Sequence, residues 1–419
     1  MLSTINLKKK KIVHIAFSRH GGAGTAAWRL HEALLNCGYN SWFLSADNAE
    51  HYDIRQNWVV IKETFLFRVR KFIKWRILNN KNFLKKENLR KKLSFLRKEK
   101  NIESATLPFS YYDLNENKLV QEADIINLHW VSKIIDFDQF FRECKVPIVW
   151  TMHDLNPILG VFHYRNEMIL HSKEFNQLDQ EVQSIKKDCY IKYSKNITVV
   201  SPSIWLSNEI INSKLFLQTK IHYIPYSIPL NIFRPLNKKT LRQKLNFKDD
   251  EIIILFVADK LNIYRKGFDL LLEAFDLLKL KNVSMVSIGD PPKNIQTKSK
   301  IYYTGHISSQ EKLAEYYSCS DVFIIPSREE VLGNVMLESL SCGTPVIGFA
   351  IGGLLDQIVN GISGFLVNEI SAESLAKAIL YFINRSETFD RNLIRKYACE
   401  KFCEKKQVEA YEKIYLDLI

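Results

Sequence analysis

The chain has 419 residues, 46% of them hydrophobic and 25% charged, which predicts a folded protein of two domains of about 200 residues each. Most of its net charge of +13 arises in residues 62–100, which argues against a uniformly basic nucleic-acid binder. Apolar runs fall short of the about 20 residues of a membrane span, and the 7 scattered cysteines favour a reducing cytoplasm without disulfides or a metal cluster. The basic N-terminus passes directly into an apolar strand, so we expect no signal peptide.

Residues 12–17 form the first expected strand, and a glycine-rich turn and a helix over about 25–37 follow it. Gly22, Gly24 and Ala27 match the dinucleotide pattern G-x-G-x-x-A, and Asp47 lies 20 residues after Ala27. Taken alone, this segment predicts a nicotinamide or flavin site. The backbone N–H groups of the same turn could equally face the phosphates of another ligand.

The basic segment 62–100 carries apolar residues at helical spacing, with Lys and Arg on other faces. The apolar positions in its first part are Leu66, Val69, Ile73 and Ile77, and those in its second part are Leu89, Leu93 and Leu96. Such helices can lie on an anionic membrane surface. The alternative is an amphipathic helix that packs on its own domain and leaves a basic face in solvent.

Two histidines follow expected strands of the N-terminal half. His129 comes after an apolar strand that ends near Asn127, and His153 comes after the strand 146–152. The carboxyl ends of parallel strands are where open α/β sheets bind ligands, so both positions are candidates for function. A single histidine can equally be a structural hydrogen-bonding residue.

Pro225, Pro229 and Pro235 interrupt regular structure and place the domain boundary near residues 230–240. We therefore predict an N-terminal domain over 1–232 and a C-terminal domain over 233–401. In the second domain, the strand 252–258 leads to a loop with Arg265 and Lys266 and then to a helix that begins near Gly267. Two cations at this place could neutralise a diphosphate.

The most informative stretch runs from Asp321 to Val367, as strand, helix, strand and helix with glycines at the strand ends. Glu330 lies in the turn before the first helix, and Glu338 lies eight positions later inside it. The N–H groups of Gly333 and Asn334 at the helix start favour an anion such as a diphosphate. Carboxylates beside a phosphate site suit a ligand with hydroxyl groups, such as a sugar and a ribose, although two solvated surface acids would give the same pattern.

This stretch, with its two glutamates, "SCGTPVIG" and a Gly-Gly turn, resembles the signature of the retaining glycosyltransferases of family 4, which have the GT-B fold. The resemblance implies that Glu330 binds hydroxyls of the donor sugar and Glu338 the ribose. It also implies that Lys266 and, less clearly, Arg265 bind the donor diphosphate, because the family has Gly-Arg-Leu, three residues and Lys-Gly there. "TGHIS" resembles the turn that meets the nucleotide base, which assigns Ile307 to the nucleoside.

In the N-terminal half, "NLHWVS", "VWTMHDLNPILG" and "SPSIWLSNEI" resemble the subgroup that builds bacterial exopolysaccharide, capsule, O-antigen and colanic-acid-like chains. By this resemblance His153 lies beside the donor phosphate and the anomeric carbon, and Gly21 and Gly22 line the diphosphate site. The sequence departs from the subgroup at Tyr226–Ser227, where relatives usually have Asn-Gly, and it lacks the cysteines that often follow the His153 motif.

The sequence therefore predicts an α/β protein of the GT-B fold, with two Rossmann-like domains facing across a cleft and a last helix, about 402–419, crossing back to the N-terminal domain. The implied activity is retaining, metal-independent glycosyl transfer from a nucleoside-diphosphate sugar to a growing bacterial surface glycan, and we expect the acceptor to be linked to lipid. No cofactor, metal or nucleic acid is expected. The expected location is the cytoplasm, peripheral on the inner face of the membrane. The open alternatives are a nicotinamide- or flavin-dependent enzyme and a non-catalytic sugar-nucleotide-binding protein.

Overall fold

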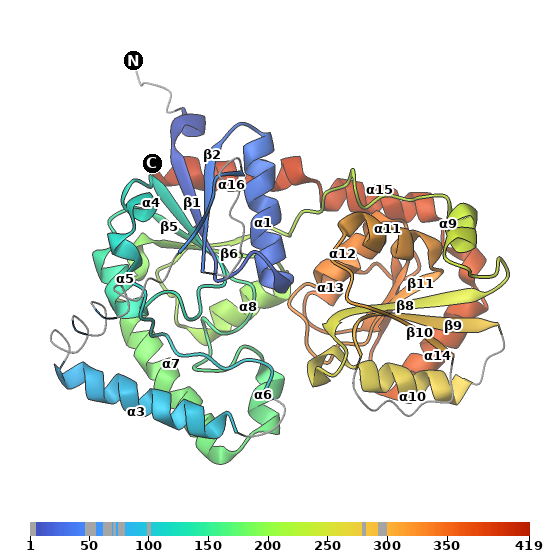
Figure 1. Cartoon of the computed structure of the whole chain (residues 1–419), viewed down its shortest axis with the longest axis horizontal. Helices are drawn as coiled ribbons and strands as arrows, with labels where there is room; N and C mark the ends of the chain where they lie inside the picture. The colour runs from blue at the N-terminus through green and yellow to red at the C-terminus, as the bar shows by residue number, and fades with distance from the viewer. Residues whose placement is uncertain are drawn as a thin grey trace. The chain divides into compact units, whose positions relative to one another are not determined.

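The structure is a computed structural model, and it describes residues 6–46, 56–61, 69, 73, 80–98, 102–278, 282–291 and 300–419. The chain divides into two compact units (Figure 1). The N-terminal unit comprises residues 1–224 and 405–419, and the C-terminal unit comprises residues 225–404. The division falls at Pro225, inside the proline-rich stretch that the sequence marks as a break.

The N-terminal unit is built on a parallel sheet of 7 strands in the order β3-β2-β1-β4-β5-β6-β7. The first strand, Lys11–Ile15, lies in the middle of the sheet between β2 and β4, as in other doubly wound folds. The strands are β1 (Lys11–Ile15), β2 (Asn40–Ser45), β3 (Trp58–Val60), β4 (Ile125–Leu128), β5 (Ile148–Thr151), β6 (Ile197–Ser201) and β7 (Ile221–Tyr223).

Helices connect these strands, and two of them meet on one face of the sheet. The helices are α1 (Gly21–Asn36), α3 (Asn80–Leu96), α4 (Lys118–Gln121), α5 (Phe137–Glu143), α6 (Arg165–Leu170), α7 (Lys173–Tyr193), α8 (Ile204–Ser213) and α16 (Glu404–Leu418). Leu30 of α1 and Val408 of α16 pack in one core cluster with Ile12, Ile125 and Val149 of the sheet. The last helix thus returns to the N-terminal unit, as the sequence predicts.

Two polar contacts fix α16 on this sheet. Asn127 of β4 donates a hydrogen bond from Nδ2 to the hydroxyl of Tyr415 at 2.8 Å, and the Thr151 and Tyr411 hydroxyls lie 2.8 Å apart. All four side chains are buried. Because unpaired polar groups are costly in a core, these bonds specify one orientation of the returning helix.

The C-terminal unit is a second parallel sheet, of 6 strands in the order β10-β9-β8-β11-β12-β13. Its strands are β8 (Ile252–Lys260), β9 (Val283–Asp290), β10 (Ile301–Gly305), β11 (Val322–Ile325), β12 (Val346–Phe349) and β13 (Gly364–Val367). Its helices are α9 (Lys238–Lys244), α10 (Phe268–Leu278), α11 (Gln310–Cys319), α12 (Asn334–Ser341), α13 (Leu354–Gln357), α14 (Ala372–Ile383) and α15 (Arg391–Lys401). Both units therefore have the Rossmann-like α/β architecture expected from the sequence.

Helix α3 is the described part of the basic segment. Its apolar residues Leu89, Leu93 and Leu96 are buried, and Lys86 forms a salt bridge of 2.7 Å with Asp136. These three leucines therefore pack within the N-terminal unit and are not available to a lipid phase. The first part of the segment lies outside the described residues apart from Val69 and Ile73. None of the helices in the described part of the chain is long and apolar enough to cross a membrane.

Candidate functional site

The glutamate-bearing stretch folds as strand β11, a turn, helix α12 and strand β12, close to its predicted bounds. Gly333, with a φ of +83°, occupies the N-cap of α12, and Asn334 is the first residue of the helix. Gly333 has no side chain that could cap the start of the helix. Backbone N–H groups at a helix start, together with the helix dipole, suit an anion.

Lys266 and Glu330, which the sequence assigns to one site, meet in the C-terminal unit. The Lys266 Nζ lies 2.6 Å from the Glu330 Oε2, and the Arg265 Nη1 lies 3.5 Å from the same oxygen. Burial raises the pKa of Glu330, but the nearby charges of Lys266 and Arg265 outweigh that effect, so its pKa is lowered. Glu330 is therefore an anion held between two cations.

The two cations differ in accessibility. Arg265 is only 5% exposed, and it donates a second bond from Nη1 to the Glu329 carbonyl oxygen at 3.0 Å. The Lys266 side chain is 23% exposed. Arg265 thus supports the turn that carries Glu330, and Lys266 is the cation that a ligand can approach. This difference favours Lys266 over Arg265 as the diphosphate contact.

Two glycines allow the backbone around Glu330 to pack closely. A Cβ on Gly352 would lie 1.9 Å from the Glu330 carbonyl oxygen, which also accepts a hydrogen bond from the Gly353 N–H at 3.1 Å. A Cβ on Gly267 would lie 1.8 Å from the Pro326 carbonyl oxygen. The Gly-Gly turn of the motif therefore seats the Glu330 backbone, a role that the sequence pattern alone does not assign.

Glu338 and Ile307 occupy other parts of the same unit. Glu338 is buried on α12 and accepts a hydrogen bond from the Tyr317 hydroxyl at 3.1 Å. Tyr317 comes from α11 and did not stand out in the sequence, because an aromatic residue at helical spacing is typical of a core. Ile307 is half-buried in the loop between β10 and α11. The roles of both residues toward a nucleoside stay predictions.

In the N-terminal unit, Gly21 and Gly22 open helix α1, and a Cβ on either would meet nothing within 4 Å. The turn is therefore open at these two residues. Gly24 differs, because a Cβ added there would lie 2.4 Å from the Ser18 carbonyl oxygen. A glycine at this position therefore allows the helix to pack closely against the backbone of Ser18. Asp47, the acidic residue of the dinucleotide pattern, lies outside the described residues.

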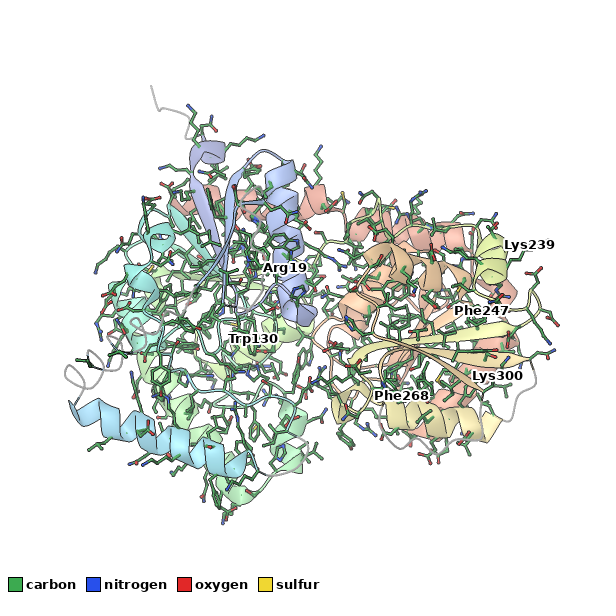
Figure 2. All side chains as sticks on the ribbon, viewed as in Figure 1. Arg19, Trp130, Lys239, Phe247, Phe268 and Lys300 are labelled. Carbon is green, nitrogen blue, oxygen red and sulfur yellow. The ribbon has the colours of Figure 1, made fainter. Side chains whose placement is uncertain are left out.

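His153 follows β5 and is 9% exposed. Burial lowers its pKa to about 4, against a raising effect of Asp154, so the ring is neutral at pH 7. Asp154 itself is held by the Trp130 indole N–H at 2.8 Å and by the His163 Nδ1 at 2.5 Å (Figure 2 labels Trp130). His153, His129, Trp130 and Asp154 all line a small cavity of the N-terminal unit.

Comparison with known proteins bears on this site. Residues 237–400 match the family model described as glycosyl transferases group 1. D-inositol 3-phosphate glycosyltransferase of Streptosporangium roseum is 25% identical over 283 residues, which is 62% of each chain. N-acetyl-alpha-D-glucosaminyl L-malate synthase of Bacillus anthracis is 24% identical over 242 residues, and an uncharacterized 41.2 kDa protein in the cps region of Klebsiella pneumoniae is 24% identical over 306. The alignment with the Streptosporangium protein thus leaves more than a third of that relative unmatched.

Solved structures share the fold over nearly the whole chain. Sucrose-phosphate synthase from Thermosynechococcus elongatus has a TM-score of 0.68 at 18% identity, with 98% of this chain and 99% of that chain covered. Anabaena Alr3699/HepE in complex with UDP and glucose has a TM-score of 0.67 at 14% identity, with 98% and 100% covered. Residues 237–400 of the C-terminal unit are therefore similar to group 1 glycosyl transferases, and the chain has the GT-B fold of the solved structures.

Proposed function

We propose that the protein is a retaining, metal-independent glycosyltransferase that moves a sugar from a nucleoside-diphosphate sugar to a growing, lipid-linked bacterial surface glycan. The observation that carries the proposal is the ion pair of Lys266 and Glu330 beside the start of α12, inside the matched domain. A cation and the N–H groups of a helix start suit a diphosphate, and a carboxylate suits sugar hydroxyls.

In the proposed reaction, the bond between the anomeric carbon and the diphosphate oxygen breaks while the acceptor oxygen bonds to the same face of that carbon. The acceptor proton passes to an oxygen of the departing diphosphate, so no protein base is needed. Lys266, with Arg265 behind it, and the N–H groups of Gly333 and Asn334 offset the charge that grows on the diphosphate. Glu330 orients the sugar, Glu338 the ribose and Ile307 the base, while Gly21, Gly22 and His153 serve the donor from the N-terminal unit.

A donor-binding panel tests this proposal. We expect UDP, GDP or ADP, alone or as its sugar, to raise the melting temperature of the full chain, and Lys266→Met to remove most of that shift. Solved structures with the same fold include complexes with UDP and with ADP, which makes these nucleotides the first to try. Release of the nucleoside diphosphate only when acceptor is present would support transfer over mere binding. A shift with NAD or a flavin and none with any nucleotide sugar would favour the oxidoreductase alternative.

We further propose that the outer face of α3 holds the protein on the anionic inner surface of the cytoplasmic membrane, where a lipid-linked acceptor would lie. The side chains of this face are exposed, and two of them are large and apolar. They are Leu84, Lys85, Lys91, Lys92, Phe95 and Lys98. Because Leu89, Leu93 and Leu96 pack inward, the contact would rest on charge and on the two exposed apolar residues.

Removing the charge of this face should weaken binding to lipid. A variant with four exposed lysines of this face changed to Gln should bind phosphatidylglycerol vesicles at least tenfold more weakly, since each basic residue contributes about 1 kcal/mol near such a surface. The four are Lys85, Lys91, Lys92 and Lys98. The matched control neutralises four exposed lysines of the C-terminal unit, Lys239, Lys312, Lys377 and Lys396 (Figure 2 labels Lys239). Sedimentation with vesicles measures both. If both variants lost vesicle binding equally, the effect would come from net charge alone, and the proposal that α3 contacts the membrane would be wrong.

A further inference from the structure

Three buried histidines form a hydrogen-bonded row in the N-terminal unit. The His14 Nδ1 lies 2.9 Å from the His129 Nε2, and the His129 Nδ1 lies 3.0 Å from the His153 Nε2. Successive rings stack with centroids 5.2 Å apart in both pairs. His14 is 0% exposed, His129 2% and His153 9%, so the row runs from the core toward the surface. The proposed reaction uses only the last of the three.

Strand register explains why the three rings meet. His14 of β1 pairs in register with Asn127 of β4, and His129 lies two residues beyond Asn127 on the same face. Asn127 pairs with Val149 of β5, so His153 lies four residues beyond that partner, again on the same face. Each neighbouring strand thus contributes a histidine two residues further toward the carboxyl edge. The row crosses the sheet on a diagonal and ends where ligands of such sheets bind.

The protons of this row are coupled. Burial lowers the pKa of His14, His129 and His153, so each ring is neutral and carries a single N–H. In each N–H···N bond one nitrogen must donate and the other accept. A neutral His129 can donate at one nitrogen only, so the two bonds point the same way along the row. They run either from His14 to His153 or in the reverse direction.

The inner end of the row selects the direction. The His14 Nε2 is buried and has no hydrogen-bond partner among the described residues. Neighbouring His31 offers no acceptor, because its Nδ1 lies 2.7 Å from the Ser41 hydroxyl and its Nε2 lies 2.9 Å from the Gln56 carbonyl oxygen. The reverse direction would place an N–H at this nitrogen, and buried N–H groups without an acceptor are rare. The forward direction leaves only a lone pair there.

We propose that His129, held by His14, is a positioning residue that fixes His153 with its proton on Nδ1 and its Nε2 lone pair engaged. His153 then serves the transfer reaction as a neutral hydrogen-bond donor and has no lone pair left to act as a general base. The role in transfer rests on the proposed function, but the tautomer does not. His14 and His129 thereby act on the reaction only through His153, and neither needs to touch the substrate.

The wild-type protein tests the tautomer directly. With ¹⁵N-labelled histidine, multiple-bond ¹H–¹⁵N spectra separate protonated from unprotonated ring nitrogens, and the loss of signals in single His→Gln variants assigns the rings. We expect protonated Nδ1 and unprotonated Nε2 in His14, His129 and His153 alike. A protonated Nε2 in His153 would overturn the proposal, whether or not any nucleotide sugar is turned over. Absence of transfer with the expected tautomer would instead reject the proposed function alone.

Two variants of equal size then test the coupling to the reaction. His129→Asn keeps a donor near the place of Nδ1, and we expect the His153 tautomer to persist with kcat within about threefold of wild type. His129→Asp offers only acceptors there, so the His153 proton should move to Nε2 and kcat should fall at least tenfold with little change in the donor KM. His31→Phe, a buried neighbour outside the row, should change neither the tautomer nor kcat. Equal kcat in the Asn and Asp variants, with the tautomer moved in one, would contradict the positioning role.

Discussion

Glu330→Gln should lower kcat/KM for sugar transfer by about 10²–10³-fold, the usual effect of removing one preorganised electrostatic group from an active site. The variant keeps the shape of the side chain but loses the charge that Lys266 and Arg265 hold in place. A neutral amide accepts hydroxyl hydrogen bonds more weakly than a carboxylate does. Steady-state kinetics with the donor found in the binding panel measures the loss.

Glu329→Gln is the matched control for this prediction. Glu329 and Glu330 are adjacent, and both are 7% exposed, but the proposed sugar contact is the carboxylate of Glu330, which pairs with Lys266 and Arg265. We expect the Glu329 variant to retain activity within about threefold. Glu330→Ala is a poorer test, because it removes the hydrogen-bond acceptor as well as the charge beside buried Arg265, and breaking a buried pair in this way costs about 3–5 kcal/mol and can unfold the protein. Full activity in Glu330→Gln would remove the sugar-orienting role of Glu330.

The stability of the Glu330→Gln variant relative to wild type should depend on pH. Against the opposing effect of burial, the pKa of Glu330 is lowered from its ordinary value of 4.5, chiefly by the charge of Lys266, so the folded state binds its proton less readily than the unfolded state does. The ion pair therefore stabilises the fold above about pH 4.5, and this stabilisation is lost as the pH falls through the lowered pKa. The stability deficit of Glu330→Gln should be largest near neutral pH and shrink in acid.

Gly352→Ala should disrupt the site through the Gly-Gly turn that packs against the Glu330 backbone. The added Cβ would lie 1.9 Å from the Glu330 carbonyl oxygen, and the residue has a φ of +49°, so the backbone must move. We expect a loss of unfolding free energy of at least about 3 kcal/mol and a loss of transfer activity of at least tenfold. Thermal or urea unfolding and the transfer assay measure the two effects.

Gly361→Ala separates the clash from the backbone penalty. Gly361 has a φ of +78°, and a Cβ there would meet nothing within 4 Å. A side chain in this region of φ costs about 1–2 kcal/mol, so the control should be mildly destabilised and remain active. If both variants lost stability equally and both stayed active, the close approach of Gly352 to Glu330 would not be required for activity.

Much of the C-terminal unit could be predicted from the sequence, because its signals are local. The apolar run before Pro326, the glycines at the strand ends and the helical spacing of Met336, Leu337 and Leu340 predict strand and helix without any distant contact. The meeting of Lys266 and Glu330, which are 64 residues apart, is different because it depends on a distant contact. That meeting was expected only because the motifs resemble a family, since a pattern of residues does not by itself bring two loops together.

The sequence by itself determined that α3 would be basic and amphipathic, and that His129 and His153 would follow adjacent strands. Only the tertiary structure decided that Leu89 and Leu93 pack inward, and that His14 completes a row with the other two histidines. The physical reason is that strand order and register are set by contacts between distant segments. His14 and His129 are 115 residues apart, and they meet because β1 and β4 are neighbours in the sheet.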